Sequence, residues 1–80
     1  MIGVLVSGEG TNLQAMIDNG LPIVAVASNN TKAKALDRAA RAGIEAAAFP
    51  GVEFESREAR DLAMAEFLEE RGVRWVVCAG

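Results

Sequence analysis

The chain has 80 residues, 51% of them hydrophobic and 24% charged, which is typical of one small packed domain rather than of a disordered segment. Its net charge of −3 argues against a general nucleic-acid surface, because phosphate backbones are bound mainly by clustered lysine and arginine side chains. A single cysteine and no histidine exclude a structural zinc site.

Nothing in the sequence predicts a membrane segment. No apolar stretch approaches the roughly 20 residues that span a bilayer. The first residues also lack the basic start and the cleavage site of a signal peptide. The lone Cys78 has no partner for an internal disulfide, which fits a reducing compartment. We therefore expect a cytoplasmic protein.

The first predicted unit is a strand followed by a helix. Ile2 to Val6 is a continuous apolar run, as expected of a strand that is covered on both faces. Thr11 to Asn19 follows with apolar residues at helical spacing. These residues, which we expect on the buried face, are Leu13, Met16 and Ile17.

A second unit repeats the pattern. The apolar run Ile23 to Ala27 predicts a strand, and it stops at a polar turn. Thr31 is expected to cap a helix that continues to Arg41, with Gly43 ending it. The residues expected to face inward are Ala33, Leu36 and Ala40.

The third unit begins with a short strand at Ile44 to Ala48. Ser56 is then expected to cap a helix that continues to Arg71, with Gly72 after it. Its predicted buried stripe consists of Ala59, Leu62, Ala63 and Phe67. The apolar stretch "VRWVVCAG" predicts a fourth buried strand.

Strands that alternate with helices predict a parallel sheet with helices on its faces. We therefore expect one Rossmann-like α/β unit over residues 1–80, with four strands and three helices. No helix follows the last strand, although parallel sheets are normally covered on both faces. The unit thus resembles an incomplete doubly wound domain, and its open sheet edge is expected to promote association into homo-oligomers.

The segment "SGEGTN" lies between the first strand and the first helix, where parallel sheets bind their ligands. Gly8 and Gly10 allow a sharp turn and a close approach to a ligand. The amides of Gly10, Thr11 and Asn12 fall at the start of the helix, where a phosphate dianion satisfies unpaired N–H groups. Two interpretations stay open here: an anion site, or a plain strand-to-helix turn capped by Thr11 or Asn12.

The type of phosphate ligand can be narrowed. A dinucleotide-binding fingerprint requires a third glycine, where this chain has Leu13, and an acidic residue after the second strand, where it has Ser28 to Asn30. A P-loop requires a lysine where Thr11 stands. The loop therefore fits a monophosphate better than a nucleotide, and Glu9 is expected to point away from it.

Four segments carry a resemblance to a known family. "SGEGTNLQAMID", "ASNN", "SREA" and the closing "VVCAG" resemble the amino-terminal half of the phosphoribosylglycinamide formyltransferases of purine biosynthesis. The resemblance implies formyl transfer from 10-formyltetrahydrofolate to glycinamide ribonucleotide. It also implies that Gly10, Thr11 and Asn12 bind the substrate phosphate.

The resemblance implies roles for two further positions. Arg57 matches an arginine that faces the active site, where it would meet either the substrate phosphate or a folate carboxylate; from the sequence alone, it is a solvated helix charge. Gly80 matches a glycine that precedes the pteridine-binding loop. The family's catalytic asparagine, histidine and aspartate fall beyond these 80 residues, so the resemblance implies no catalytic residue in this chain and no activity from it alone.

The remaining candidates are interpreted as structural. Cys78 and Trp75 are expected to pack in the core, and five arginines are expected to be solvated charges; these are Arg38, Arg41, Arg60, Arg71 and Arg74. The alternative to an enzyme is a non-catalytic α/β half-domain that binds a phosphate ligand or self-associates. An NAD-linked oxidoreductase, a third class, predicts nicotinamide binding.

Overall fold

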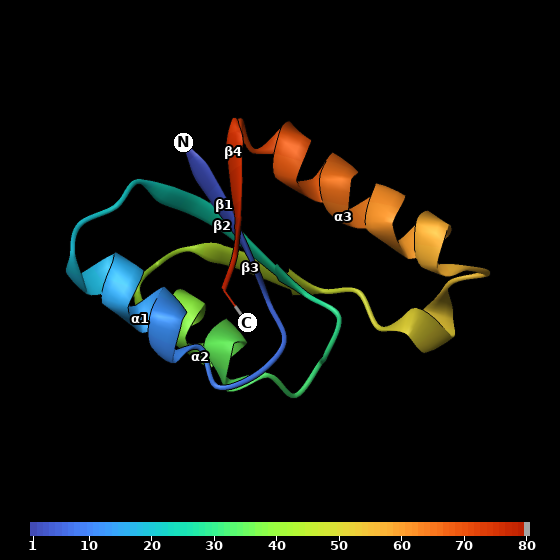
Figure 1. Cartoon of the computed structure of the whole chain (residues 1–80), viewed down its shortest axis with the longest axis horizontal. Coiled ribbons are helices and arrows are strands. Elements are labelled where there is room, and N and C mark those ends of the chain that lie inside the picture. The colour runs from blue at the N-terminus through green and yellow to red at the C-terminus, as the bar shows by residue number, and fades with distance from the viewer. Residues whose placement is uncertain (80) are drawn as a thin grey trace.

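A computed structural model describes residues 1–79, in which four parallel strands form one sheet of order β3-β2-β1-β4 (Figure 1). The strands are β1 (Ile2–Val6), β2 (Ile23–Ser28), β3 (Glu45–Ala48) and β4 (Trp75–Cys78). The helices are α1 (Thr11–Asp18), α2 (Lys34–Arg41) and α3 (Arg57–Glu70), with a 3-10 turn at Gly51–Glu53. The predicted fold class, a partial Rossmann-like α/β unit, is confirmed.

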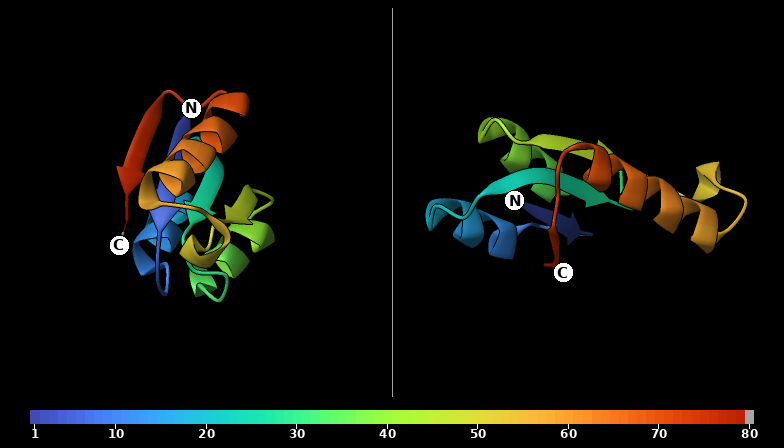
Figure 2. Two further views of the ribbon diagram at one scale, coloured as in Figure 1. Left: turned by 90° about the vertical axis from the view of Figure 1, so that its right-hand side faces the viewer. Right: turned by 90° about the horizontal axis from the view of Figure 1, so that it is seen from above.

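The helices cover both faces of the sheet. Helices α1 and α2 lie on one face and α3 lies on the other (Figure 2). On the first face, Val4 and Val6 of β1 pack in a buried cluster with Leu13 of α1 and with Ala35 and Ala39 of α2. On the second face, a smaller cluster joins β2 to Leu68 of α3. Coverage of both faces explains why β1 is apolar at every position.

The strand order reverses beside β1. From β1 the chain passes through α1 to β2 and through α2 to β3, and it then returns through α3 to β4 on the other side of β1. Open α/β sheets bind ligands at such switch points, outside the carboxyl ends of the strands. The fold therefore places the loop after β1 at the position where a ligand is expected.

The predicted start of α2 is wrong. Thr31 does not cap the helix, which begins three residues later at Lys34. The side-chain Oδ1 of Asn30 accepts a hydrogen bond from the Lys32 amide at 2.9 Å. The main-chain carbonyl of Asn30 accepts one from the Ala33 amide at 3.2 Å. This local turn competes with helix formation over residues 30–33.

The buried faces of two helices also differ from the predicted ones. Ala40 is exposed, whereas Ala35 and Ala39 are fully buried against the sheet. On α3, Leu62 is 61% exposed and Leu68 takes its place in the core. Alanine-rich and charged helices give a weak periodic signal, so the buried face is decided by tertiary packing.

Among residues 1–79, no helix has the length and apolar character of a membrane span.

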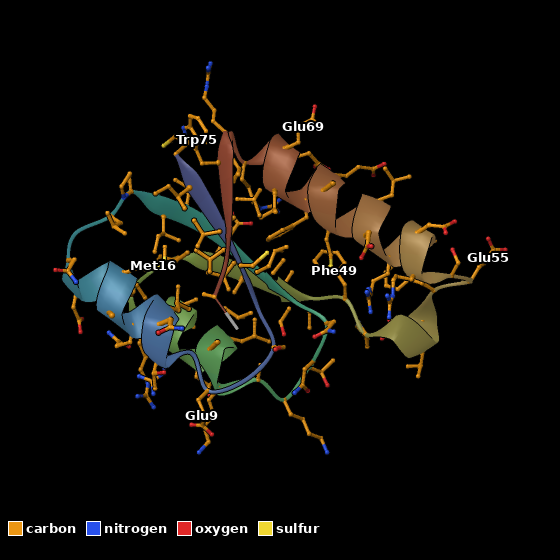
Figure 3. All side chains as sticks on the ribbon, in the orientation of Figure 1. Glu9, Met16, Phe49, Glu55, Glu69 and Trp75 are labelled. Carbon is orange, nitrogen blue, oxygen red and sulfur yellow. The ribbon has the colours of Figure 1, made fainter. Side chains whose placement is uncertain are left out.

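The prediction that β4 is buried is wrong as well. All four residues of this edge strand are exposed, including Trp75 at 71% and Cys78. Figure 3 shows Trp75 beside the amino terminus, away from the helices. Trp75 and Cys78 are therefore not core residues here, because within residues 1–79 no element lies beyond β4 to cover them.

Candidate functional site

The glycine loop, residues 7–10, joins β1 to α1 at the switch point. Gly10 is the N-cap residue of α1 and has a φ of +80°, a conformation that glycine adopts without steric cost. Within residues 1–79, no side chain caps this helix. The interpretation that Thr11 or Asn12 serves only as a cap is therefore not supported, and the first amides of α1 lack that partner.

The second strand–helix unit holds the carbonyls of the glycine loop. The carbonyl of Ser7 accepts from Nδ2 of Asn30 at 3.3 Å, and that of Gly8 accepts from the amide of Ala35 at 3.2 Å. The Glu9 carbonyl accepts from Nε of Arg38 at 2.8 Å. Three successive peptides of the loop are thus anchored on the side of α2.

The anchored carbonyls fix where the loop amides point. A trans peptide places its C=O and N–H on opposite sides, and residues 1–79 contain no cis peptide. The N–H groups of Gly8, Glu9 and Gly10 therefore point away from α2. Among the hydrogen bonds of residues 1–79, none is donated by these three amides. These donors continue into the first turn of α1, whose amides lack intrahelical partners. Gly8, Glu9, Thr11 and Asn12 are exposed, whereas Gly10 is buried.

Side chains at the loop keep negative charge away from these donors. The Glu9 side chain is exposed and points outward in Figure 3, as predicted. Its Oε1 lies 3.7 Å from Nζ of Lys34, and both side chains are largely exposed. Thr11 and Asn12 are exposed at the same end of α1, so their hydroxyl and amide groups are accessible to a ligand. This arrangement of donors can bind a small anion.

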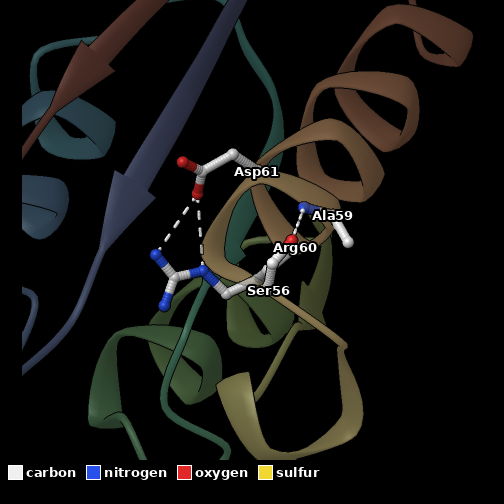
Figure 4. A network of polar contacts seen from close by, with 4 residues as sticks. All are labelled: Ser56, Ala59, Arg60 and Asp61. Atoms are coloured by element: carbon white, nitrogen blue, oxygen red, sulfur yellow. Dashed lines mark hydrogen bonds and ion pairs between the residues drawn. The ribbon is translucent and has the colours of Figure 1, made fainter.

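A groove of about 520 Å³ lies next to the loop, between α3 and the carboxyl ends of β1 and β4. Its polar lining includes Ser7, Asn29, Arg60 and Asp61, and its apolar lining includes Leu5, Val6, Met64, Ala65, Leu68 and Val76; Cys78 also lines it. Nη2 of Arg60 lies 3.2 Å from Oδ1 of Asp61 (Figure 4). Residues 10–12 do not line this groove, so the open amides and the groove are adjacent but separate surfaces.

The structure places Arg57 apart from the glycine loop. It is exposed in the first turn of α3 and shares no hydrogen bond or ion pair with the described residues of the loop. Gly80 lies outside the described residues. The sequence-based candidates Gly10, Thr11 and Asn12 lie together, whereas Arg57 is not brought to them.

Three arginines interpreted as solvated charges have structural roles. Arg38 is half-buried against the loop, and Arg60 lines the groove with a side chain that is only 19% exposed. Arg71 stacks 4.0 Å above the ring of Phe67 and pairs with Glu45. The role of Arg38 could not be predicted from the sequence, because its partner Glu9 is 29 residues away along the chain and no local pattern indicates such a contact.

A family model described as formyl transferase matches residues 1–80. A phosphoribosylglycinamide formyltransferase from Haemophilus influenzae is 39% identical over 85 residues, and one from Escherichia coli is 40% identical. Each match covers 99% of this chain but 40% of the relative. A trifunctional purine biosynthetic protein from Drosophila pseudoobscura is 38% identical, with 6% of its length covered.

Solved structures give the same result. The glycinamide ribonucleotide transformylase 1 from Symbiobacterium toebii superimposes with a TM-score of 0.91 at 44% identity, covering 99% of this chain and 40% of that one. A phosphoribosylglycinamide formyltransferase from Streptococcus pneumoniae gives a TM-score of 0.91 at 37% identity, with 43% of its chain covered. The predicted resemblance to the amino-terminal part of these enzymes is confirmed.

Proposed function

Because this chain belongs to the formyl transferase family, we propose that it forms the substrate-phosphate-binding part of a phosphoribosylglycinamide formyltransferase. The complete reaction transfers a formyl group from 10-formyltetrahydrofolate to the amine of glycinamide ribonucleotide. The observation that supports the proposal is the row of loop amides that donate no hydrogen bond among residues 1–79, because the ribonucleotide's 5′-phosphate could accept from them.

The loop would act as the handle for the substrate. The dianion accepts hydrogen bonds from the amides of Gly10, Thr11 and Asn12, and the positive end of the α1 dipole faces it. The Thr11 hydroxyl and the Asn12 side-chain amide can add donors. Binding through the phosphate leaves the glycinamide amine free to extend toward the strand ends, where the formyl donor would be met.

We infer that these residues bind the substrate and that the chemistry of transfer requires further groups. The formyl donor supplies an activated one-carbon group, and the attacking amine must lose a proton. The 80-residue sequence contains no histidine. The resemblance implies that the family's catalytic asparagine, histidine and aspartate match no position in it. We therefore assign no catalytic residue to this chain and expect it to be inactive alone. Arg57 is retained as a candidate for the substrate phosphate or for a folate carboxylate.

The alternative is a non-catalytic half-domain that binds a phosphate ligand or associates with another copy. The exposed apolar strand β4 favours this alternative. The codons that follow residue 80 in the gene distinguish the two. An Asn-x-His motif soon after residue 80, with an aspartate further on, supports the enzyme, whereas a stop codon supports the half-domain.

The substitution Asn12→Ala, made in the protein as its gene encodes it, tests the phosphate assignment. We expect the KM for glycinamide ribonucleotide to rise about tenfold or more, since a hydrogen bond to a charged group contributes about 1.5–3 kcal/mol. The KM for the folate should change little. Asn19→Ala, at the opposite end of α1, is the matched control and should leave both constants unchanged. Equal rises in both constants for Asn12→Ala would contradict the assignment.

A further inference from the structure

Arg38 contacts the glycine loop through hydrogen bonds to neutral acceptors and not through an ion pair. Its Nε donates to the Glu9 carbonyl at 2.8 Å, and its Nη1 approaches Oε1 of Gln14 at 3.4 Å. Among residues 1–79, no carboxylate forms an ion pair with it. The guanidinium of this partly buried residue thus donates to a backbone carbonyl and a neutral amide oxygen.

The carbonyl that Arg38 holds belongs to the peptide that carries the Gly10 N–H. Holding the Glu9 oxygen on the α2 side turns that N–H away from α2. Gly10 itself is buried in the unliganded chain. The Arg38 side chain also packs against Gly10, because a Cβ built on Gly10 would lie 3.1 Å from Cδ of Arg38. One side chain therefore fixes both the plane of the peptide and the position of its glycine.

We infer that Arg38 is a positioning residue for the phosphate site: it fixes the Glu9–Gly10 peptide so that the Gly10 amide faces the ligand. The inference rests on the proposed function of the loop. It assigns to Arg38 a hydrogen-bonding role and not a direct electrostatic one. A neutral side chain with a donor at the position of Nε should therefore replace it.

Two substitutions separate the donor from the charge. Arg38→Gln places Nε2 at the same distance along the side chain as the arginine Nε and removes the charge. Arg38→Met keeps the apolar stem and has no donor. Arg41→Met, on the same helix but exposed, is the control for loss of a positive charge from α2.

In the protein as its gene encodes it, we expect Arg38→Met to raise the KM for glycinamide ribonucleotide about tenfold. The folate KM should not change. For Arg38→Gln, the KM for glycinamide ribonucleotide should stay within about threefold of that of the unsubstituted protein. For Arg41→Met, this KM should equal that of the unsubstituted protein. Equal rises of this KM in Arg38→Gln and Arg38→Met would show that the positive charge is required. An unchanged KM in both variants would show that the contact does not contribute to substrate binding. Either result would overturn the inference.

A second measurement does not depend on enzymatic activity. Titration with inorganic phosphate, followed by the NMR signal of the Gly10 amide, should shift that signal in the unsubstituted protein and in Arg38→Gln. In Arg38→Met the shift should require about tenfold more phosphate. If the Arg38→Met protein does not fold, the titration of Arg38→Gln tests the inference by itself. A folded Arg38→Gln protein that binds phosphate more weakly than the unsubstituted protein would overturn the inference. If the protein shows the expected shifts but has no formyl transfer activity, the proposed function is refuted and the inference about Arg38 stands. If phosphate does not shift the Gly10 signal of the unsubstituted protein, the inference is overturned.

Discussion

Gly10 is the residue on which the shape of the loop depends most. Its φ of +80° lies in the left-handed region. A Cβ at this position would also lie 2.6 Å from Cα of Ala35 in α2. The first constraint is local and the second is tertiary, because Gly10 allows the loop and α2 to approach closely. The loop carbonyls reach their donors only when Gly10 has this left-handed conformation and α2 lies close to it.

Substitution of three glycines should separate these constraints. Gly10→Ala should destabilise the protein by about 2–5 kcal/mol, the sum of left-handed strain and a clash with backbone. Gly20→Ala should cost about 1–2 kcal/mol, since Gly20 has a φ of +75° with open space around it. Gly8→Ala should be close to neutral, because Gly8 has no positive φ and no atom of residues 1–79 lies within 4 Å of the built Cβ.

Unfolding in urea measures the three free energies under the same conditions. A Gly10→Ala protein as stable as Gly20→Ala would show that the loop does not depend on contact with α2.

At this scale, the sequence predicted the part of the site that is local. The glycines and the polar pair Thr11 and Asn12 indicate a turn into a helix whatever surrounds them. The anchors Asn30, Ala35 and Arg38 could not be predicted, because they meet the loop only once β1 and β2 pair in register. The proposed direction of the amides therefore depends on the structure and not on the motif.

The helices show how local chemistry decides where an element begins. Ser56 caps α3 as predicted, and its Oγ accepts a hydrogen bond from the Ala59 amide at 3.1 Å (Figure 4). Thr31 has the same capping chemistry, but it lies inside a turn organised by Asn30. Ser28 supports that turn, since its Oγ accepts from the Asn30 amide at 3.0 Å. A capping residue in the sequence is therefore not sufficient when its neighbour forms a competing turn.

Removal of each hydroxyl should give different results. Ser56→Ala should lower the free energy of unfolding by about 1 kcal/mol, the usual contribution of an N-cap side chain. Thr31→Ala should change it by less than about 0.5 kcal/mol, because Thr31 is exposed and lies before the helix. Thermal unfolding measures both. A larger loss for Thr31→Ala than for Ser56→Ala would contradict the observed start of α2.

At the scale of the whole molecule, strand β4 is an exposed apolar edge of the sheet. Trp75, Val76 and Val77 are exposed to 71%, 51% and 37%, and within residues 1–79 their strand pairs with β1 alone. The bacterial relatives and solved structures described above are longer, and this chain covers about two fifths of each. An apolar edge strand is a template for pairing with another chain. The strand and its open edge could be predicted from the sequence, but its exposure could not. An apolar run indicates that a strand is stable when buried, and it does not show whether another element covers it.

We therefore predict that the 80-residue chain self-associates through β4. Val77→Lys should reduce this association, since a lysine on an edge strand opposes strand pairing. Val52→Lys, at a residue that is 95% exposed in the 3-10 turn, is the matched control and should leave association unchanged. Light scattering at high protein concentration measures the mass. A monomeric unsubstituted chain would contradict this prediction.

A crystal structure with glycinamide ribonucleotide bound tests the central claim most directly. The account predicts phosphate oxygens at about 2.7–3.2 Å from the amide nitrogens of Gly10, Thr11 and Asn12, with the carbonyl of Glu9 still held by Arg38. A phosphate held instead by Arg60 in the groove or by Arg57, with no contact to the loop amides, would contradict it.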